Sequence, residues 1–319
     1  MALKSLLLLA SALEFARCER DDVVFMQHRG QKAVCDAPLE WPCDSQLLST
    51  FPLQVINRDR DKCDTEASDI KYLNLTSGTY LPICYIPNTC LNACGISPIS
   101  GLIYCQAFGF DGDRSHRQLV RVNCPYSHVE SLLEFSDGSL KLTSDLPAPQ
   151  EGSVCYYGQI TSSFAASFDP DDGRYVFRVD SKILAVTQND LSSFSGTPSP
   201  AAASQTQVLD AEEELRTVSG IDGVADFVIS TVDLNNGQGT RKYLLGCDGN
   251  KVQSVPLDSG ARVQLTMEGS DPEGNSGAQW AFGKEIFCAY NNGDDGVIDA
   301  RSRGCFSRPF CRLYGQYGQ

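Results

Sequence analysis

The side chains best suited to chemistry in this sequence are carboxylates and amides in a few Asp- and Asn-rich segments. Ca²⁺ binds through oxygen atoms of such side chains and of the main chain. The alternative is turn chemistry, because Asp and Asn bond their own backbone and Gly accepts positive φ. No cofactor is therefore predicted, with calcium as the alternative. The candidate ligands are Asp169, Asp171, Asp172, Asp226, Asn291, Asn292, Asp294 and Asp295.

Other catalytic signatures are weak. The sequence has no Gly-x-Ser-x-Gly elbow and no Asp-x-Asp-x-Asp-Gly loop with its distant Glu, which excludes the α/β-hydrolase nucleophile and the EF-hand. The three histidines, His28, His116 and His128, are scattered. No catalytic residue is predicted, and we expect a non-enzymatic protein.

The fourteen cysteines predict disulfides and an oxidising compartment. Zinc is the rival interpretation, but the closest spacing is Cys90-x-x-x-Cys94 and histidine is scarce. Spacing does not give the pairing. We expect Cys305 and Cys311 to pair with each other or with the N-terminal extension, and so to help close the fold.

The first residues predict secretion. Lys4 precedes a short apolar run and a small-x-small site, which is typical of a signal peptide cleaved after Ala12. The run is too short to span a bilayer, so no membrane insertion is expected. Asn74-Leu75-Thr76 is a glycosylation sequon at Asn74, although Asn and Thr could be purely structural there. The net charge of −14 excludes a nucleic-acid partner, which requires a basic surface.

Strand patterns dominate the rest of the chain, with a short helix-like stretch only around 210–218. Alternating apolar runs and Asp/Asn-Gly turns form five similar units. Such a repeated sheet of short strands is typical of a β-propeller blade. The aromatic residues of these strands are expected in the core rather than in a ligand-stacking role: Tyr104, Phe177, Tyr243, Trp280 and Phe287.

The fold class predicted is all-β, a propeller of five or six blades with a disulfide-tied N-terminal extension. The Ser-, Ala- and Pro-rich segment 192–207 predicts a flexible insertion, or alternatively a linker between domains. The expected organisation is a signal peptide at 1–12, a Cys-rich extension at 13–49, a propeller at 50–304 and a C-terminal tail at 305–319.

Four short motifs occur in one order between about Phe51 and Ala300. They are Gly95, Pro98, Gly101 and Tyr104, with Ser100 where Asp is usual; Gln118 to Asn123; Asp258-Ser259-Gly260; and Gly277, Ala278, Trp280, Asn291 and Asn292. In these motifs the chain resembles a family of secreted, propeller-like repeat domains of unassigned function. The resemblance implies a propeller in an adhesion or surface context and supplies no catalytic residue.

The sequence therefore predicts a secreted, extracellular binding or adhesion module whose partner is an extracellular protein or glycan. The alternative is a calcium-dependent, lactonase-like propeller hydrolase. A third hypothesis is a structural component of an extracellular matrix, which would show as self-association.

Overall fold

The computed structural model describes part of the 319-residue chain. The described residues are 35, 53–58, 62–63, 65–74, 79–109, 117–125, 133–136, 139–142, 148–203, 208–221, 224–234, 237, 239–266, 275–282, 285–291 and 298–305. They all lie in the compact unit Lys32–Gln319. The signal-peptide and tail predictions (1–12 and 306–319) fall outside them.

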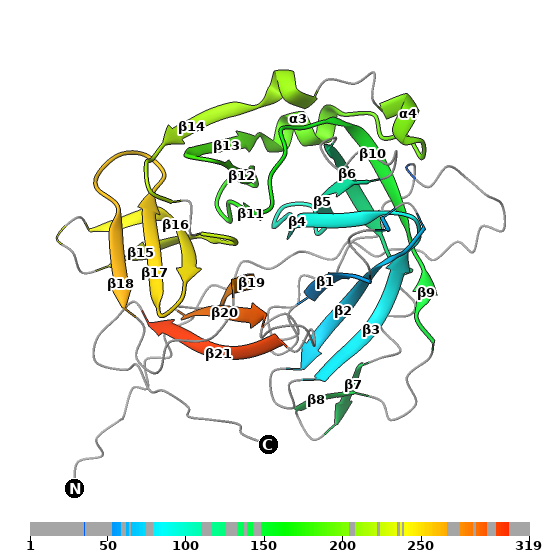
Figure 1. The fold of residues 1–319 in the computed structure, drawn as a ribbon, viewed down its shortest axis with the longest axis horizontal. Helices are drawn as coiled ribbons and strands as arrows, with labels where there is room; N and C mark the ends of the chain where they lie inside the picture. Colours follow the sequence, from blue (N-terminus) through cyan, green and yellow to red (C-terminus); the bar gives the residue numbers. More distant parts are fainter. Residues whose placement is uncertain are drawn as a thin grey trace, which may run out of the picture. The chain divides into compact units, whose positions relative to one another are not determined.

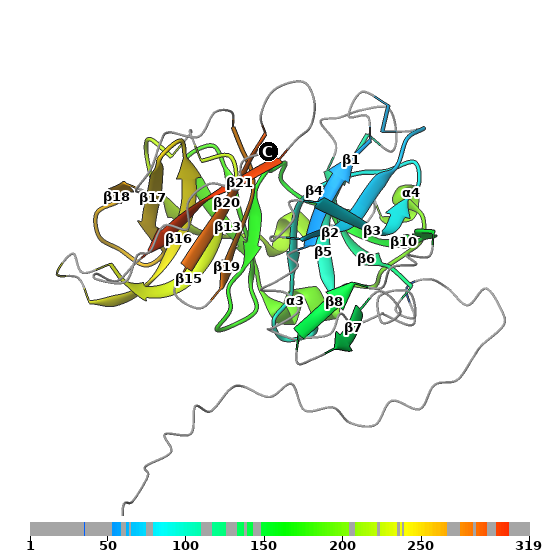
Figure 2. The same ribbon diagram turned by 90° about the horizontal axis from the view of Figure 1, so that it is seen from below.

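The described chain is organised in β-sheets (Figures 1 and 2). The first sheet has the order β1 (Leu53–Asn57), β2 (Ser68–Asn74), β3 (Thr79–Ile86) and β9 (Gln150–Glu151). The second has the order β4 (Cys90–Ile96), β5 (Ile103–Phe108), β6 (Arg117–Asn123) and β10 (Ser153–Gln159). A separate hairpin, β7 (Leu133–Ser136) and β8 (Ser139–Leu142), lies between β6 and β9 in the chain.

The third and fourth sheets are simple antiparallel meanders. The third consists of β11 (Ala166–Phe168), β12 (Tyr175–Val179), β13 (Lys182–Val186) and β14 (Glu213–Thr217). The fourth consists of β15 (Val228–Asp233), β16 (Thr240–Asp248), β17 (Lys251–Pro256) and β18 (Val263–Thr266). A fifth, three-stranded sheet contains β19 (Asn275–Phe282), β20 (Glu285–Asn291) and β21 (Ile298–Cys305).

The first strands of successive sheets contact one another. β1 contacts β4, β4 contacts β11, β11 contacts β15, and β15 contacts β19. This succession of meanders is the propeller arrangement, so the all-β propeller prediction is confirmed. Four sheets have the four strands of a full blade. The count of five or six blades stays a prediction.

Sheets of this kind bury both faces against their neighbours. Every residue of β5 and β6 is buried. One apolar cluster joins the first and second sheets and another joins the third and fourth. Tyr104, Phe177 and Tyr243 are buried, as predicted. The side chains of Trp280 and Phe287 lie outside the described set.

Within the part of the chain that the structure describes, ten cysteines form five disulfides. Cys63–Cys90 and Cys84–Cys124 join the first sheet region to the second, and Cys247–Cys288 joins β16 to β20. Cys94–Cys105 lies within the second sheet, and Cys35–Cys155 ties the N-terminal extension to β10. Cys305 is the last residue of β21 rather than part of a tail; its side chain and Cys311 are not described, so the predicted clasp stays a prediction.

Two local expectations differ from the structure. The described part of 192–207 is not a featureless insertion: it includes the end of α3 (Gln188–Ser193) and α4 (Pro200–Ala203). Thr197 bridges to Tyr156, and Ala203 is fully buried in the core. Small residues such as Ala and Ser pack closely where composition alone suggests a loop.

The helix-like stretch around 210–218 is also different. It contains the end of a 3-10 helix, η1 (Val208–Ala211), followed by strand β14. Pairing with β13 supplies the hydrogen bonds of this segment, so tertiary context overrides its helical propensity. Among the described residues, no helix is long and apolar enough to cross a membrane.

Candidate functional site

The richest polar cluster in the described chain begins in the turn between β11 and β12. The Asp169 carboxylate accepts a hydrogen bond from the Asp171 amide at 3.0 Å, and the Asp172 carboxylate accepts one from the Arg174 amide at 3.1 Å. The Gly173 amide donates to the Asp169 carbonyl at 2.9 Å. These are the self-directed bonds expected of turn chemistry.

Glycine is required at the end of this turn. Gly173 has φ of +70°, and a Cβ there would lie 2.4 Å from Cδ1 of Ile99, in the turn between β4 and β5. The absence of a side chain at Gly173 therefore permits the positive φ and leaves room for the Ile99 side chain. The turn is consequently held by its own sequence and by the neighbouring sheet.

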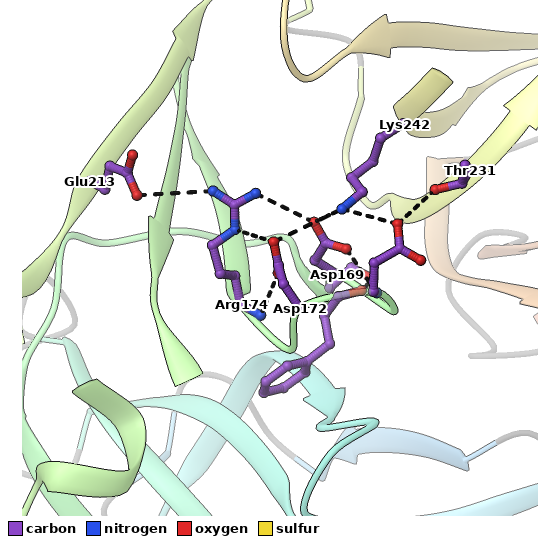
Figure 3. A network of polar contacts seen from close by, with 9 residues as sticks. Asp169, Asp172, Arg174, Glu213, Thr231 and Lys242 are labelled. Atoms are coloured by element: carbon purple, nitrogen blue, oxygen red, sulfur yellow. Dashed lines mark hydrogen bonds and ion pairs between the residues drawn. The ribbon is translucent and has the colours of Figure 1, made fainter. Parts of the chain in front are cut away.

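A lysine of the fourth sheet reaches into this turn (Figure 3). Nζ of Lys242, on β16, lies 2.7 Å from Oδ2 of Asp169, 3.1 Å from Oδ2 of Asp171 and 3.9 Å from Oδ2 of Asp172. The Asp169 side chain is 0% exposed, so its charge depends on such partners. Lys242 therefore clamps the third sheet to the fourth.

Arg174 and Thr231 complete the cluster. Nε of Arg174 lies 2.9 Å from Oδ2 of Asp172, and its Nη atoms lie 3.6 Å from Asp169 and 3.9 Å from Glu213. The Thr231 hydroxyl on β15 donates to Asp171 at 3.0 Å. We call these seven residues the Lys242 cluster: Asp169, Asp171, Asp172, Arg174, Glu213, Thr231 and Lys242.

These contacts shift the pKa values of two groups in the cluster, Asp171 and Lys242. The hydrogen bond from Lys242, opposed in part by desolvation, lowers the pKa of Asp171 below 3.8. Desolvation acts to lower the pKa of Lys242, but its hydrogen bonds to Asp169 and Asp171 outweigh it and raise that pKa above 10.5. Both shifts favour the charged forms, so the ion pair persists at neutral pH.

The Lys242 ammonium group occupies the position that a cation bound by both Asp169 and Asp171 would occupy. Those two carboxylates are thereby engaged, and that of Asp169 also accepts a hydrogen bond within the turn. Throughout the ranges that the structure describes, no group of three or more His, Cys, Asp or Glu is arranged to hold a metal ion. The arrangement is suited to joining two sheets.

Among the remaining sequence candidates, Asp226 has a described side chain, and it is not part of this cluster. Asp226 precedes β15; its carbonyl accepts a hydrogen bond from Gln279 at 2.6 Å, and desolvation of its carboxyl group raises its pKa to about 8. Asn291 ends β20 and Asn74 ends β2, with side chains outside the described set. Asn292, Asp294 and Asp295 are not among the described residues.

The cations of the cluster are the functional side chains that sequence reasoning missed. Arg174 directly follows the Asp-Asp-Gly turn, so the sequence alone could have placed it beside these carboxylates. Lys242 is the third residue of β16 and lies 73 residues from Asp169 in sequence. Only the packing of β16 beside the turn of β11 and β12 identifies it.

Comparison with known proteins gives little. No family model and no curated protein matches the chain. Among solved structures, a chain of the "Crystal structure of Nidogen/Laminin Complex" is similar with a TM-score of 0.33 and 11% identity, over 70% of this chain and 82% of that chain. The fold assignment accordingly rests on the sheets themselves.

Proposed function

We propose that this protein is a secreted, extracellular β-propeller that acts as a binding or adhesion module and not as an enzyme. Its partner is an extracellular protein or a glycan. The observation that carries the proposal is that disulfide bonds join neighbouring sheets. They are Cys63–Cys90, Cys84–Cys124 and Cys247–Cys288. Such bridges form and persist in oxidising compartments.

The use of the candidate carboxylates supports binding over catalysis. Asp169 and Asp171 are both paired with Lys242, and Asp172 is paired with Arg174. A calcium-dependent hydrolase needs carboxylates free to take the ion and polarise a substrate. In the Lys242 cluster these carboxylates instead form the ion pairs that join the third sheet to the fourth.

The test uses the full chain secreted from eukaryotic cells. The labelled protein is expected to bind saturably to an immobilised extracellular-matrix preparation and to be displaced by unlabelled protein. Reduced and alkylated protein is the control, since it keeps the composition and charge and loses the fold. Binding that does not saturate, or that the control reproduces, would overturn the proposal.

A second arm addresses hydrolysis. The same protein is incubated with a panel of lactones and aryl esters with and without calcium. No calcium-dependent turnover is expected. Turnover that Asp169→Asn abolishes would establish the hydrolase in place of the binding module.

A further inference from the structure

Three arginines gather around the turn that links β17 to β18. Arg216 comes from β14 of the third sheet, whereas Arg241 comes from β16 and Arg262 from the end of the turn itself. The turn follows Pro256, the last residue of β17, and runs from Leu257 to Arg262. We call the three side chains the arginine cluster.

Arg216 is fixed by main-chain oxygens. Its Nη1 donates to the Pro256 carbonyl and its Nη2 to the Gly260 carbonyl, each at 2.5 Å. Both acceptors belong to the fourth sheet, so the guanidinium crosses from one sheet to the next. Two bonds from one planar group determine its orientation.

The other two arginines are held in the same manner. Nη1 of Arg241 donates to the Ser259 carbonyl at 2.9 Å, and its Nη2 lies 3.3 Å from Oδ2 of Asp258. Nη1 of the exposed Arg262 donates to the Gly220 carbonyl, just beyond β14. Backbone oxygens on both sides of the joint therefore position the three guanidinium groups.

The charge at this place is opposite to that of the whole protein. Arg216 and Arg241 act on one carboxylate, Asp258, and Arg262 lies four residues further along the chain. The formal charges of these four residues add up to two positive charges. Carbonyl oxygens orient a guanidinium without neutralising it. Glu214, on the same strand as Arg216, is paired with Lys182 at 2.8 Å. The chain as a whole has a net charge of −14.

The surroundings of the Asp258 carboxyl group lower its pKa. A backbone hydrogen bond from Ser259 is the largest cause of its lowered pKa, and the charges of Arg241 and Arg216 lower it further. Its side chain is 63% exposed and lies at the edge of the group. Arg216 and Arg241 are thus close enough to act together on one anion.

We propose that the arginine cluster binds sulfate groups of an extracellular sulfated glycan. Planar guanidinium groups bind tetrahedral oxyanions through paired N–H donors, and donors held by the backbone lose little freedom on binding. A positive site on a protein with a net charge of −14 also selects where a polyanion can approach. The inference rests on the proposed function and names the ligand class of the binding module.

The probe is a heparin-derived oligosaccharide, titrated against the secreted full chain by calorimetry. Arg262→Gln and Arg241→Gln are expected to weaken binding about tenfold each, the loss of one charge-assisted contact. Arg262→Lys keeps the charge and is expected to retain most of the affinity. Arg58→Gln is the matched control, because Arg58 is 45% exposed and pairs with Asp69 in the first sheet.

The melting temperature of each variant separates a binding role from a structural one. Equal losses for Arg58→Gln and Arg262→Gln, or no binding above that of the desulfated oligosaccharide, would overturn the inference. Displacement of the probe by inorganic sulfate at equal concentration would also overturn it, since the site would then be a simple anion site. Matrix binding that persists in both arginine variants would overturn the inference while leaving the proposed function intact.

Discussion

Neighbouring sheets are joined differently at two places in this protein. The first and second sheets are bridged by Cys63–Cys90 and Cys84–Cys124, with Leu91 also hydrogen-bonded to Ser68 and Asn57. The third and fourth sheets are joined by the Lys242 cluster, by the Arg178 bond to the Val224 carbonyl at 2.7 Å, and by a shared apolar cluster.

The sequence shows why the second joint is not covalent. No cysteine occurs between Cys155 and Cys247, a stretch that contains the whole third sheet. Ion pairs take the place of disulfides there. A covalent joint responds to reductant, whereas an ionic joint responds to pH and to substitution of its charges.

The largest expected effect is on the covalent joint. Replacing Cys84 and Cys124 with serine opens a loop with a sequence separation of 40, and is expected to lower the free energy of unfolding by about 4 kcal/mol. The physical reason is the larger entropy of the unfolded chain. Urea unfolding followed by circular dichroism measures it.

The control is the equivalent double replacement of Cys94 and Cys105. These residues are separated by 11 positions, so the same model gives about 3 kcal/mol. A loss for this pair larger than for Cys84 and Cys124 would contradict the entropic explanation of the joint.

The second largest expected effect is on the ion pairs that join the third sheet to the fourth. Asp169→Asn keeps the shape of the turn and removes the fully buried charge, which leaves Lys242 with a weaker set of partners. We expect a loss of about 3 kcal/mol, the lower end for breaking a buried pair. Urea unfolding at neutral pH measures it.

Lys242→Met, alone and combined with Asp169→Asn, completes a double-mutant cycle. If the two residues act as a pair, the combined loss is smaller than the sum of the single losses. Strict additivity would mean that Lys242 does not clamp the sheets through Asp169.

The ionic joint is also expected to depend on pH. The folded pKa of Asp171 lies below 3.8, so its contribution is complete above that pH and is lost as the pH falls through the folded value. The folded pKa of Lys242 lies above 10.5, so its contribution is complete below that pH and is lost as the pH rises through the folded value.

The acid side is measured with Asp171→Asn. Because Asp171 is 56% exposed, the stability difference from the unsubstituted protein is expected to be under about 1 kcal/mol near neutral pH, and to shrink as the pH falls below 3.8. A difference that grows on acidification has the wrong sign and would refute the ion pair.

The smallest expected effect comes from Thr231→Val. The substitution keeps the side-chain shape and removes the hydroxyl that donates to Asp171 at 3.0 Å. The bond is exposed, so the expected loss is about 0.5 kcal/mol, within the lower range for a hydrogen bond. Thermal unfolding with Thr240→Val as control detects it; equal shifts for both would remove Thr231 from the joint.

Local sequence alone determined the hairpins. The alternation in 175–179 and 182–186 predicted β12 and β13, and the Asp-Pro-Asp-Asp-Gly run predicted the turn before them. Residues within one hairpin are close in sequence, so period and turn type decide their structure. The acidic residues of that turn were recognised for the same reason.

Pairing across long separations was decided only in the tertiary structure. The places of β10 and β14 follow from pairing with β6 and β13, which lie well before them in the chain. The partners of the cysteines, and the position of Lys242 beside Asp169, likewise depend on which sheet packs on which. Packing of whole sheets is a property of many weak contacts at once, and no local pattern of residues encodes it.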